Sequence, residues 1–167
     1  MRHSDSKRVS RDHYDAVLFD LDGVVTDTAS LHATCWKQMF DEYLQKRARH
    51  RGEAFRPFDL ATDYRLYVDG KPRFDGVRDF LSSRGIQLPE GNPDDPAEVE
   101  TVCGLGNRKN DLVNHVIAEV GVEPYDGTVR FIHQLRRNGF KIAVVTSSQN
   151  CTAVLKAAKL DDFFEVQ

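Results

Sequence analysis

Two short apolar stretches limit the possible folds of this chain more than any other feature. They are DAVLFD at residues 15–20 and KIAVVT at residues 141–146. Each is a short continuous run that contains β-branched residues, which is typical of a strand buried on both faces of a parallel sheet. The chain between them is long and mostly helical in pattern. This order predicts an α/β protein whose parallel core is interrupted by an inserted helical cap.

The remaining elements follow from apolar periodicity and from glycines that mark helix ends. The expected helices cover residues 28–51, 75–84, 110–120, 128–138 and 151–159, and Thr28 is available as an N-cap for the first. Residues 53–74 and 86–106 are rich in Pro, Gly and Asp and are expected to be loops. We therefore assign residues 1–29 and 123–167 to the core and residues 30–122 to the cap.

Composition excludes several classes of function. With 40% hydrophobic residues, 29% charged residues and a net charge of -3, the chain is expected to be globular and to lack the basic face that nucleic-acid binding needs. No apolar run approaches the roughly 20 residues that span a membrane, and the first fourteen residues contain no apolar leader segment, so a cytoplasmic location is expected. The three cysteines, Cys35, Cys103 and Cys151, are scattered and are expected to be reduced thiols.

The segment FDLDGVVTDT, residues 19–28, places acidic residues directly after the first predicted strand. Asp20 and Thr146 both fall at the carboxyl end of a strand, which is where parallel sheets bind ligands. A hard cation such as Mg²⁺ would relieve the repulsion between Asp20 and Asp22. One carboxylate could then attack phosphorus while the other supplies a proton. From spacing alone, the alternative that these aspartates are turn and cap residues is equally good.

Four segments together resemble a known family. FDLDGVVTDTASLHATCW resembles the first motif of the haloacid dehalogenase superfamily of phosphoryl-transfer enzymes, in its β-phosphoglucomutase branch. VVTSSQN is similar to the second motif, and DGKPRFDGV and GNRKND are similar to two cap segments. The resemblance runs from Ala16 onward, apart from a longer cap around residues 46–66 and 86–106. It implies a Rossmann-like parallel sheet with a helical cap.

The resemblance also implies roles for residues at the strand ends. Asp20 would be the nucleophile that forms an aspartyl phosphate, and Asp22 the general acid and base. Asp20 and the Asp22 carbonyl would bind Mg²⁺, and Thr146 would hydrogen-bond a phosphoryl oxygen. Ser148 and Asn150 fall where this branch contacts a second phosphate.

Further implied roles fall on residues from the cap. Arg73 matches the arginine that grips the phosphate that is not transferred. In the core loop with Ser148 and Asn150, Gln149 replaces a lysine often found there. Lys109 and Asn110 match residues near the sugar, and His32 and Trp36 match residues of the helix next to the hinge. The alternatives are a core position for Trp36, an exposed or capping role for His32, and surface charges for Arg73 and Lys109.

The family also uses a lysine after a third strand and an acidic pair after a fourth. Asp161 and Asp162 follow a helical segment instead, and Lys156 and Lys159 lie on that segment. We therefore expect a partial chain that is weakly active or inactive by itself.

The implied function is Mg²⁺-dependent interconversion of sugar 1- and 6-phosphates, with a small-molecule sugar phosphate as the partner. The alternatives are a sugar-phosphate phosphatase of the same superfamily and a non-catalytic binding piece. The sequence specifies neither the sugar nor the oligomeric state.

Overall fold

The computed structural model describes residues 9–164. Its two strands, β1 (Ala16–Asp20) and β2 (Lys141–Val145), pair in parallel, with Asp20 opposite Val145. Both apolar stretches thus form strands, and the strands end at the same edge of the sheet. The α/β class with a parallel sheet is confirmed. Residues 1–8 and 165–167 lie outside the described residues.

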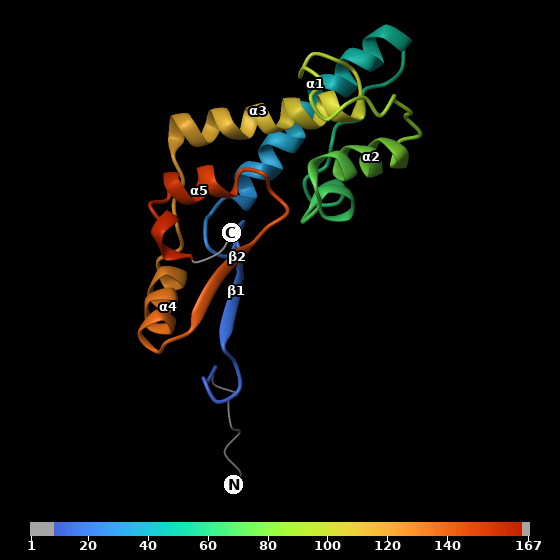
Figure 1. Ribbon diagram of the computed structural model, residues 1–167. Helices are drawn as coiled ribbons and strands as arrows, with labels where there is room; N and C mark the ends of the chain where they lie inside the picture. The colour runs from blue at the N-terminus through green and yellow to red at the C-terminus, as the bar shows by residue number, and fades with distance from the viewer. Residues whose placement is uncertain (1–8, 165–167) are drawn as a thin grey trace.

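Helices fill most of the remaining described chain. They are α1 (Ala29–Arg51), the π-helical turn η1 (Tyr64–Val68), α2 (Arg73–Ser83), α3 (Val102–Val120), α4 (Asp126–Arg137), α5 (Cys151–Ala157) and the 3₁₀ turn η2 (Asp161–Phe163). In Figure 1, α4 and α5 lie beside the strands, and α3 runs from there toward α1 and α2. No helix within residues 9–164 is long and apolar enough to cross a membrane.

Two expectations about the helices need correction. Helix α3 begins at Val102 and not at residue 110, because the Thr101 hydroxyl accepts a 2.9 Å hydrogen bond from the Gly104 amide and caps it. Gly104 and Gly106 lower helix propensity in this turn, but tertiary packing overrides that preference. Thr28 precedes α1, yet its side chain makes no capping hydrogen bond. Its hydroxyl donates to the Asp22 carboxylate instead.

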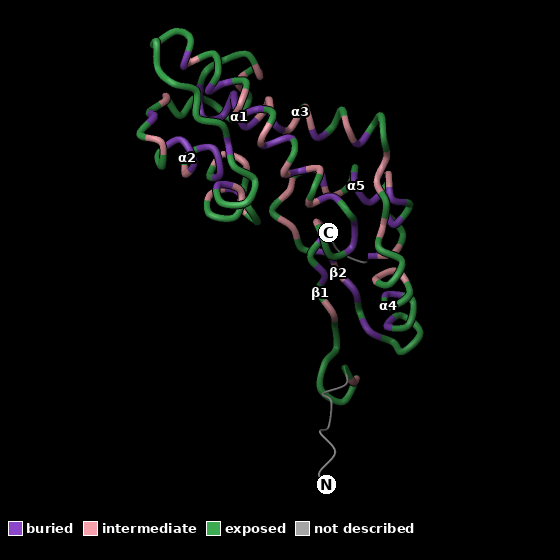
Figure 2. The backbone as a smooth tube through the Cα atoms, turned by 180° about the vertical axis from the view of Figure 1, so that it is seen from behind, coloured by how far each residue is buried: buried purple, intermediate pink, exposed green. Residues whose placement is uncertain are grey.

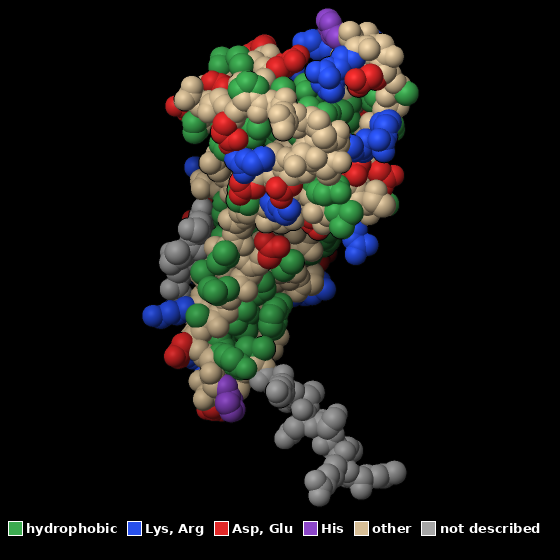
Figure 3. Space-filling model, turned by 90° about the vertical axis from the view of Figure 1, so that its right-hand side faces the viewer, with side chains coloured by type: hydrophobic (Ala, Val, Ile, Leu, Met, Phe, Trp, Pro, Cys, Tyr) green, Lys and Arg blue, Asp and Glu red, His purple; other side chains and the backbone are tan. Residues whose placement is uncertain are grey.

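Residues 9–164 cover one face of the sheet and leave the other exposed. Phe19, Ile142 and Val144 are buried in a hydrophobic cluster with residues of α4 and α5. Leu18 and Val145 project from the other face and are 66% and 58% exposed, so the prediction of burial on both faces is wrong there. Within the part of the chain that the structure describes, α4 and α5 pack on one side alone. Figure 3 shows hydrophobic side chains gathered over the half of the molecule that contains the strands.

The buried side chains form two hydrophobic clusters, and Figure 2 shows buried segments in both α1 and α3. The strand cluster combines the covered sheet face with Cys35, Val113 and Ile117. The aromatic cluster is centred on Phe40, which packs against other rings, namely Trp36, Phe58 and Phe80. The proposed division at residues 30 and 122 stays a prediction. All three cysteines are free, as expected.

Candidate active site

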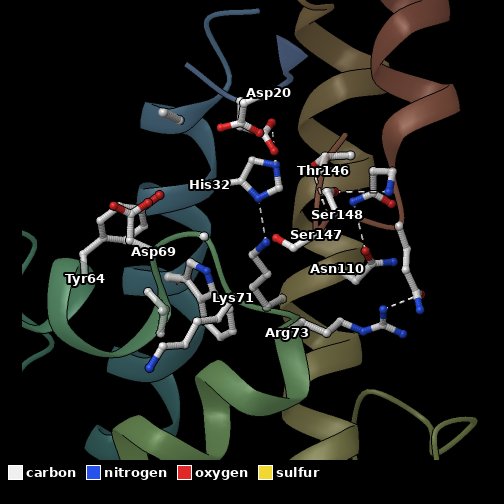
Figure 4. Close-up of a pocket in the computed structure, with 18 residues that line it drawn as sticks. Asp20, His32, Tyr64, Asp69, Lys71, Arg73, Asn110, Thr146, Ser147 and Ser148 are labelled. Carbon is white, nitrogen blue, oxygen red and sulfur yellow. Dashed lines mark hydrogen bonds and ion pairs between the residues drawn. The ribbon is translucent and has the colours of Figure 1, made fainter. Parts of the chain in front are cut away.

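A cleft opens at the carboxyl ends of β1 and β2, and Figure 4 shows its lining. All ten residues singled out from the sequence line this cleft. Those that come from the strands and the loops after them form what we call the strand side: Asp20, Asp22, Thr146, Ser148 and Asn150. Those that come from α1, α2 and α3 form the helix side: His32, Trp36, Arg73, Lys109 and Asn110.

The first loop of the strand side is a tight turn that follows β1. Gly23 has a φ of 82°, a left-handed value that favours glycine, and its amide donates a 2.8 Å hydrogen bond to the Thr26 carbonyl. The Asp20 carboxylate accepts from the Leu21 amide at 2.8 Å and is otherwise directed to the cleft. The turn interpretation of these aspartates is therefore correct about the backbone, but it leaves both carboxylates lining a cleft.

Asp22 is held from two directions. Thr28 donates a hydrogen bond to its Oδ1 atom, and His32 Nε2 lies 3.4 Å from the same oxygen. That His32 nitrogen is buried, and its alignment with Asp22 is too poor for a hydrogen bond. Burial alone would raise the pKa of Asp22, but the attractions to His32 and Thr28 outweigh it and lower the pKa below its ordinary value. Asp22 is thus a carboxylate at neutral pH.

A buried lysine connects this group to α3. Lys109 is 6% exposed, and its Nζ atom lies 2.7 Å from His32 Nδ1 and 5.0 Å from the centre of the Trp36 ring. Burial lowers the pKa of Lys109 to about 8, although Cys35 and Asp22 act in the opposite direction. The alternatives of a surface lysine and an exposed histidine are wrong. Trp36 belongs to the aromatic cluster and lines the cleft as well.

Arg73, the first residue of α2, is held by neutral partners. Its Nε and Nη2 atoms donate to Asn107 Oδ1 at 3.2 and 3.0 Å, and its Nη1 atom donates to Gln149 Oε1. The guanidinium also lies over the Phe74 ring, 4.4 Å from its centre. Among residues 9–164, no carboxylate lies within 4.0 Å of Arg73. Its positive charge is therefore available to an anion in the cleft.

The loop after β2 forms a chain of short-range hydrogen bonds. The Ser148 amide donates to Thr146 Oγ1 at 3.0 Å, and the Asn150 amide donates to Ser148 Oγ at 3.2 Å. Asn150 then donates from Nδ2 to Asn110 Oδ1 on α3 at 3.0 Å. This last contact joins the strand side to the helix side.

Sequence reasoning missed part of the helix side. Tyr64, Asp69 and Lys71 also line the cleft. Asp69 and Lys71 belong to the matched segment that contains Arg73, and Tyr64 precedes it. Burial and then the neighbouring Asp69 carboxylate raise the pKa of Tyr64 well above its ordinary value, so its hydroxyl stays protonated. The available signal was the pair of charged residues, Asp69 and Lys71, at the start of DGKPRFDGV. The position of Tyr64 depends on the π-helical turn η1, which no periodicity announced.

The oxygen atoms at the strand ends suit Mg²⁺, which keeps water and substrate ligands, better than a metal ion that is bound by protein side chains alone. Among residues 9–164, no group of three or more His, Cys, Asp or Glu side chains is arranged to hold a metal ion. Mg²⁺, however, is commonly bound by one or two carboxylates together with water and substrate phosphates. Asp20 and Asp22 fit that smaller requirement. The cleft is not lined by the residues that were compared with the family's acidic pair and lysine, namely Asp161, Asp162, Lys156 and Lys159.

Comparisons with known proteins agree with this geometry. The family model described as haloacid dehalogenase-like hydrolase matches residues 14–167. The chain is 55% identical over 150 residues to proteins named β-phosphoglucomutase from Mycobacterium bovis and Mycobacterium tuberculosis, covering 90% of this chain and 57% of each of them. A Bacillus subtilis protein of the same name is 29% identical over 90% of the chain and 59% of its own length. The chain thus spans little more than half the length of these curated relatives.

A solved structure supports the fold. The β-phosphoglucomutase of Clostridium difficile superposes with a TM-score of 0.67 at 24% identity, over 91% of this chain and 60% of that one. At this level of identity, the likeness concerns the fold alone.

Proposed function

The chain belongs to the haloacid dehalogenase-like hydrolase family, and from that premise we propose that it serves Mg²⁺-dependent phosphoryl transfer on a sugar phosphate. The favoured reaction is interconversion of sugar 1- and 6-phosphates through an aspartyl phosphate, as the name of the mycobacterial relatives suggests. One observation carries the proposal: a single cleft is lined by all ten residues that the family resemblance selects. A cytoplasmic location and a small-molecule sugar phosphate as partner belong to the same proposal.

Asp20 and Asp22 divide the chemistry in this proposal. When a sugar hydroxyl attacks the phosphoryl group carried by Asp20, the ionised Asp22 carboxylate takes the hydroxyl proton, and the Asp20 carboxylate leaves. In the reverse sense, Asp20 attacks the phosphate of a sugar phosphate and Asp22 returns the proton to the departing oxygen. The lowered pKa of Asp22 keeps its carboxylate ionised, which is the form that the first of these steps requires. Thr28 and His32 hold its carboxylate in place.

The proposed metal site uses atoms at the end of β1. The Asp20 carboxylate and the Asp22 carbonyl would hold Mg²⁺, with substrate and water oxygens as the other ligands. When bound, the ion neutralises negative charge on the phosphoryl group. Thr146 would add a hydrogen bond from its hydroxyl to a phosphoryl oxygen.

A second phosphate distinguishes a mutase from a simple phosphatase. Arg73 carries a positive charge that no described carboxylate neutralises, and it meets the loop after β2 through Gln149. Ser148 and Asn150 lie on the same loop and line the cleft. We assign these three residues, Arg73, Ser148 and Asn150, to the phosphate that is not transferred. A sugar-phosphate phosphatase remains the second candidate, because water entering the cleft would hydrolyse the same aspartyl phosphate.

The test is a product assay with Mg²⁺, β-glucose 1-phosphate and glucose 1,6-bisphosphate as primer. Glucose 6-phosphate and free phosphate are measured separately, on the 167-residue chain and on a longer chain that also carries the family's third and fourth strands. Excess glucose 6-phosphate supports the mutase, and stoichiometric free phosphate supports the phosphatase. If neither product forms in either sample, the chain is a binding piece and the proposal is wrong.

A further inference from the structure

Asn107, in the matched segment GNRKND, accepts two hydrogen bonds from the Arg73 guanidinium, although the resemblance gave it no role. Its Oδ1 atom accepts from Arg73 Nε at 3.2 Å and from Nη2 at 3.0 Å. These atoms form one edge of the planar guanidinium, so a single amide oxygen fixes the direction of the whole plane. Arg73 is left with Nη1, which points to Gln149 on the strand side.

The Asn107 amide is itself fixed from behind. Its Nδ2 atom donates to the Pro93 and Asp95 carbonyls, at 2.8 Å in each case. These two bonds leave Oδ1 as the group that faces Arg73. The same loop is tied to the start of α3, because Thr101 Oγ1 donates to Asp95 Oδ2 at 2.7 Å. The loop that contains Pro93 and Asp95 thus fixes the Asn107 side chain, which in turn fixes Arg73.

Packing on the opposite side of the arginine completes the arrangement. The Phe74 ring lies beneath the guanidinium, and α2 approaches α3 closely at Gly106. A Cβ atom at Gly106 would lie 2.6 Å from Phe74 Cδ1 and 3.4 Å from Arg73 Cγ. Glycine is therefore needed for this approach, which brings Asn107 within reach of Arg73.

We propose that Asn107 is a positioning residue that orients Arg73 toward the phosphate that is not transferred. The inference rests on the proposed function, since it presumes that Arg73 binds this phosphate. A neutral amide suits the task because it directs the guanidinium and leaves its charge intact. A carboxylate in the same place would form an ion pair with Arg73 and compete with the incoming anion. Holding the long side chain in one orientation also reduces the conformational entropy lost on binding.

The test is a double-mutant cycle on binding of glucose 1,6-bisphosphate with Mg²⁺, measured by calorimetry. All variants carry Asp20→Asn, so that no phosphoryl group is transferred during the titration. Arg73→Ala is expected to raise Kd about a hundredfold and Asn107→Ala about tenfold, as expected for hydrogen bonds to charged groups. The double variant is expected to match Arg73→Ala within about twofold, because Asn107 acts through Arg73. Asn114→Ala, an exposed asparagine two turns further along α3, is the matched control and should leave Kd unchanged.

If Asn107→Ala fails to fold, Asn107→Asp provides the test instead. Asn107→Asp keeps the shape of the side chain, and it is expected to raise Kd more than tenfold, an effect that Arg73→Ala should cancel. Independent, additive losses would overturn the positioning role, as would an unchanged Kd in Asn107→Asp. A normal Kd in Arg73→Ala would instead refute the phosphate-binding role of Arg73 in the proposed function, and the inference would fall with it.

Discussion

On the strand side of the cleft, Asp20, Thr146 and Ser148 accept hydrogen bonds from backbone amides one or two residues away. On the helix side, Arg73 and Lys109 contact side chains far away in the sequence. Asp20 bonds to the next amide, and Thr146 to an amide two residues on. Lys109 meets His32 across 77 positions, and Arg73 meets Gln149 across 76. The strand side is therefore built by local turns, while the helix side exists only when α1, α2 and α3 are packed together.

This difference suggests a division of labour. Groups fixed by short turns keep their geometry through small movements of the helices, which suits the atoms that react. Groups fixed by long-range contacts lose their geometry when the helices separate, which suits recognition of a substrate that must enter and leave.

The largest effect is expected on the strand side. Asp20→Ala should lower phosphoryl transfer by about 10⁴-fold or more, because no other group lies ready to accept the phosphoryl group. Asp22→Ala should lower kcat for sugar phosphates by about 10²- to 10⁴-fold but should still allow slow phosphorylation by a substrate with a good leaving group. Steady-state kinetics with a sugar phosphate and an aryl phosphate measure both. Near-normal turnover of Asp20→Ala would exclude the covalent mechanism.

The next effect concerns stability of the helix side. Lys109 has a pKa of about 8 in the folded protein and an ordinary value of 10.5 when unfolded. Between these pH values the unfolded chain binds one more proton, so the free energy of unfolding rises with pH. Relative to Lys109→Met, the wild-type protein should gain on the order of 3 kcal/mol across this range. Denaturant unfolding of both proteins at pH 7.5 to 10.5 gives the comparison.

Exposed Lys156 supplies the control for that experiment. Lys156→Met should follow the wild-type pH dependence, since this side chain lies outside the cleft. If the free energy of unfolding of Lys109→Met showed the wild-type pH dependence too, the Lys109 side chain would be exposed to water in solution. The helix side would then be less tightly packed than in the structure.

A smaller effect is expected from Arg73→Ala, and it should differ between a substrate with a second phosphate and one without. Arg73→Ala should lower kcat/KM for the mutase reaction about a hundredfold, because charged hydrogen bonds to the second phosphate are lost. Turnover of a small aryl phosphate, which has no second phosphate, should stay within about twofold. Arg78→Ala on the same helix removes an exposed arginine paired with Asp75 and Glu90, and it should change neither rate. Equal losses on both substrates would show that Arg73 supports the fold.

The smallest effect is expected at Thr146. Thr146→Val keeps the shape and removes the hydroxyl, so it should lower kcat/KM about tenfold. Thr146→Ser keeps the hydroxyl and should remain within about threefold of wild type. Kinetics with the aryl phosphate report on the strand side alone. A normal rate in Thr146→Val would remove this hydroxyl from the proposed phosphoryl contacts.

The same contrast explains what the sequence could predict. The strands, the Gly23 turn and the loop after β2 depend on neighbouring residues, so short motifs were sufficient. The helix side was predicted from the resemblance, which gave no role to two of its other residues. Asn107 on α3 contacts Arg73, and Tyr64 lines the cleft from η1. The start of α3 was missed because Gly104 and Gly106 suggest a loop, although close packing requires them. Exposure of Leu18 depends on which elements cover the sheet, which its apolar run does not encode.

Helices α1 and α3 also have a consequence for unfolding. Cys35 and Trp36 are adjacent in α1, yet one belongs to the strand cluster and the other to the aromatic cluster. Leu112 of α3 packs against both clusters. Unfolding either cluster would therefore expose apolar side chains of the other to water and disrupt helical turns that both share. We expect calorimetry to show one heat-absorption peak whose calorimetric and van't Hoff enthalpies agree, so that the two clusters melt as one cooperative unit.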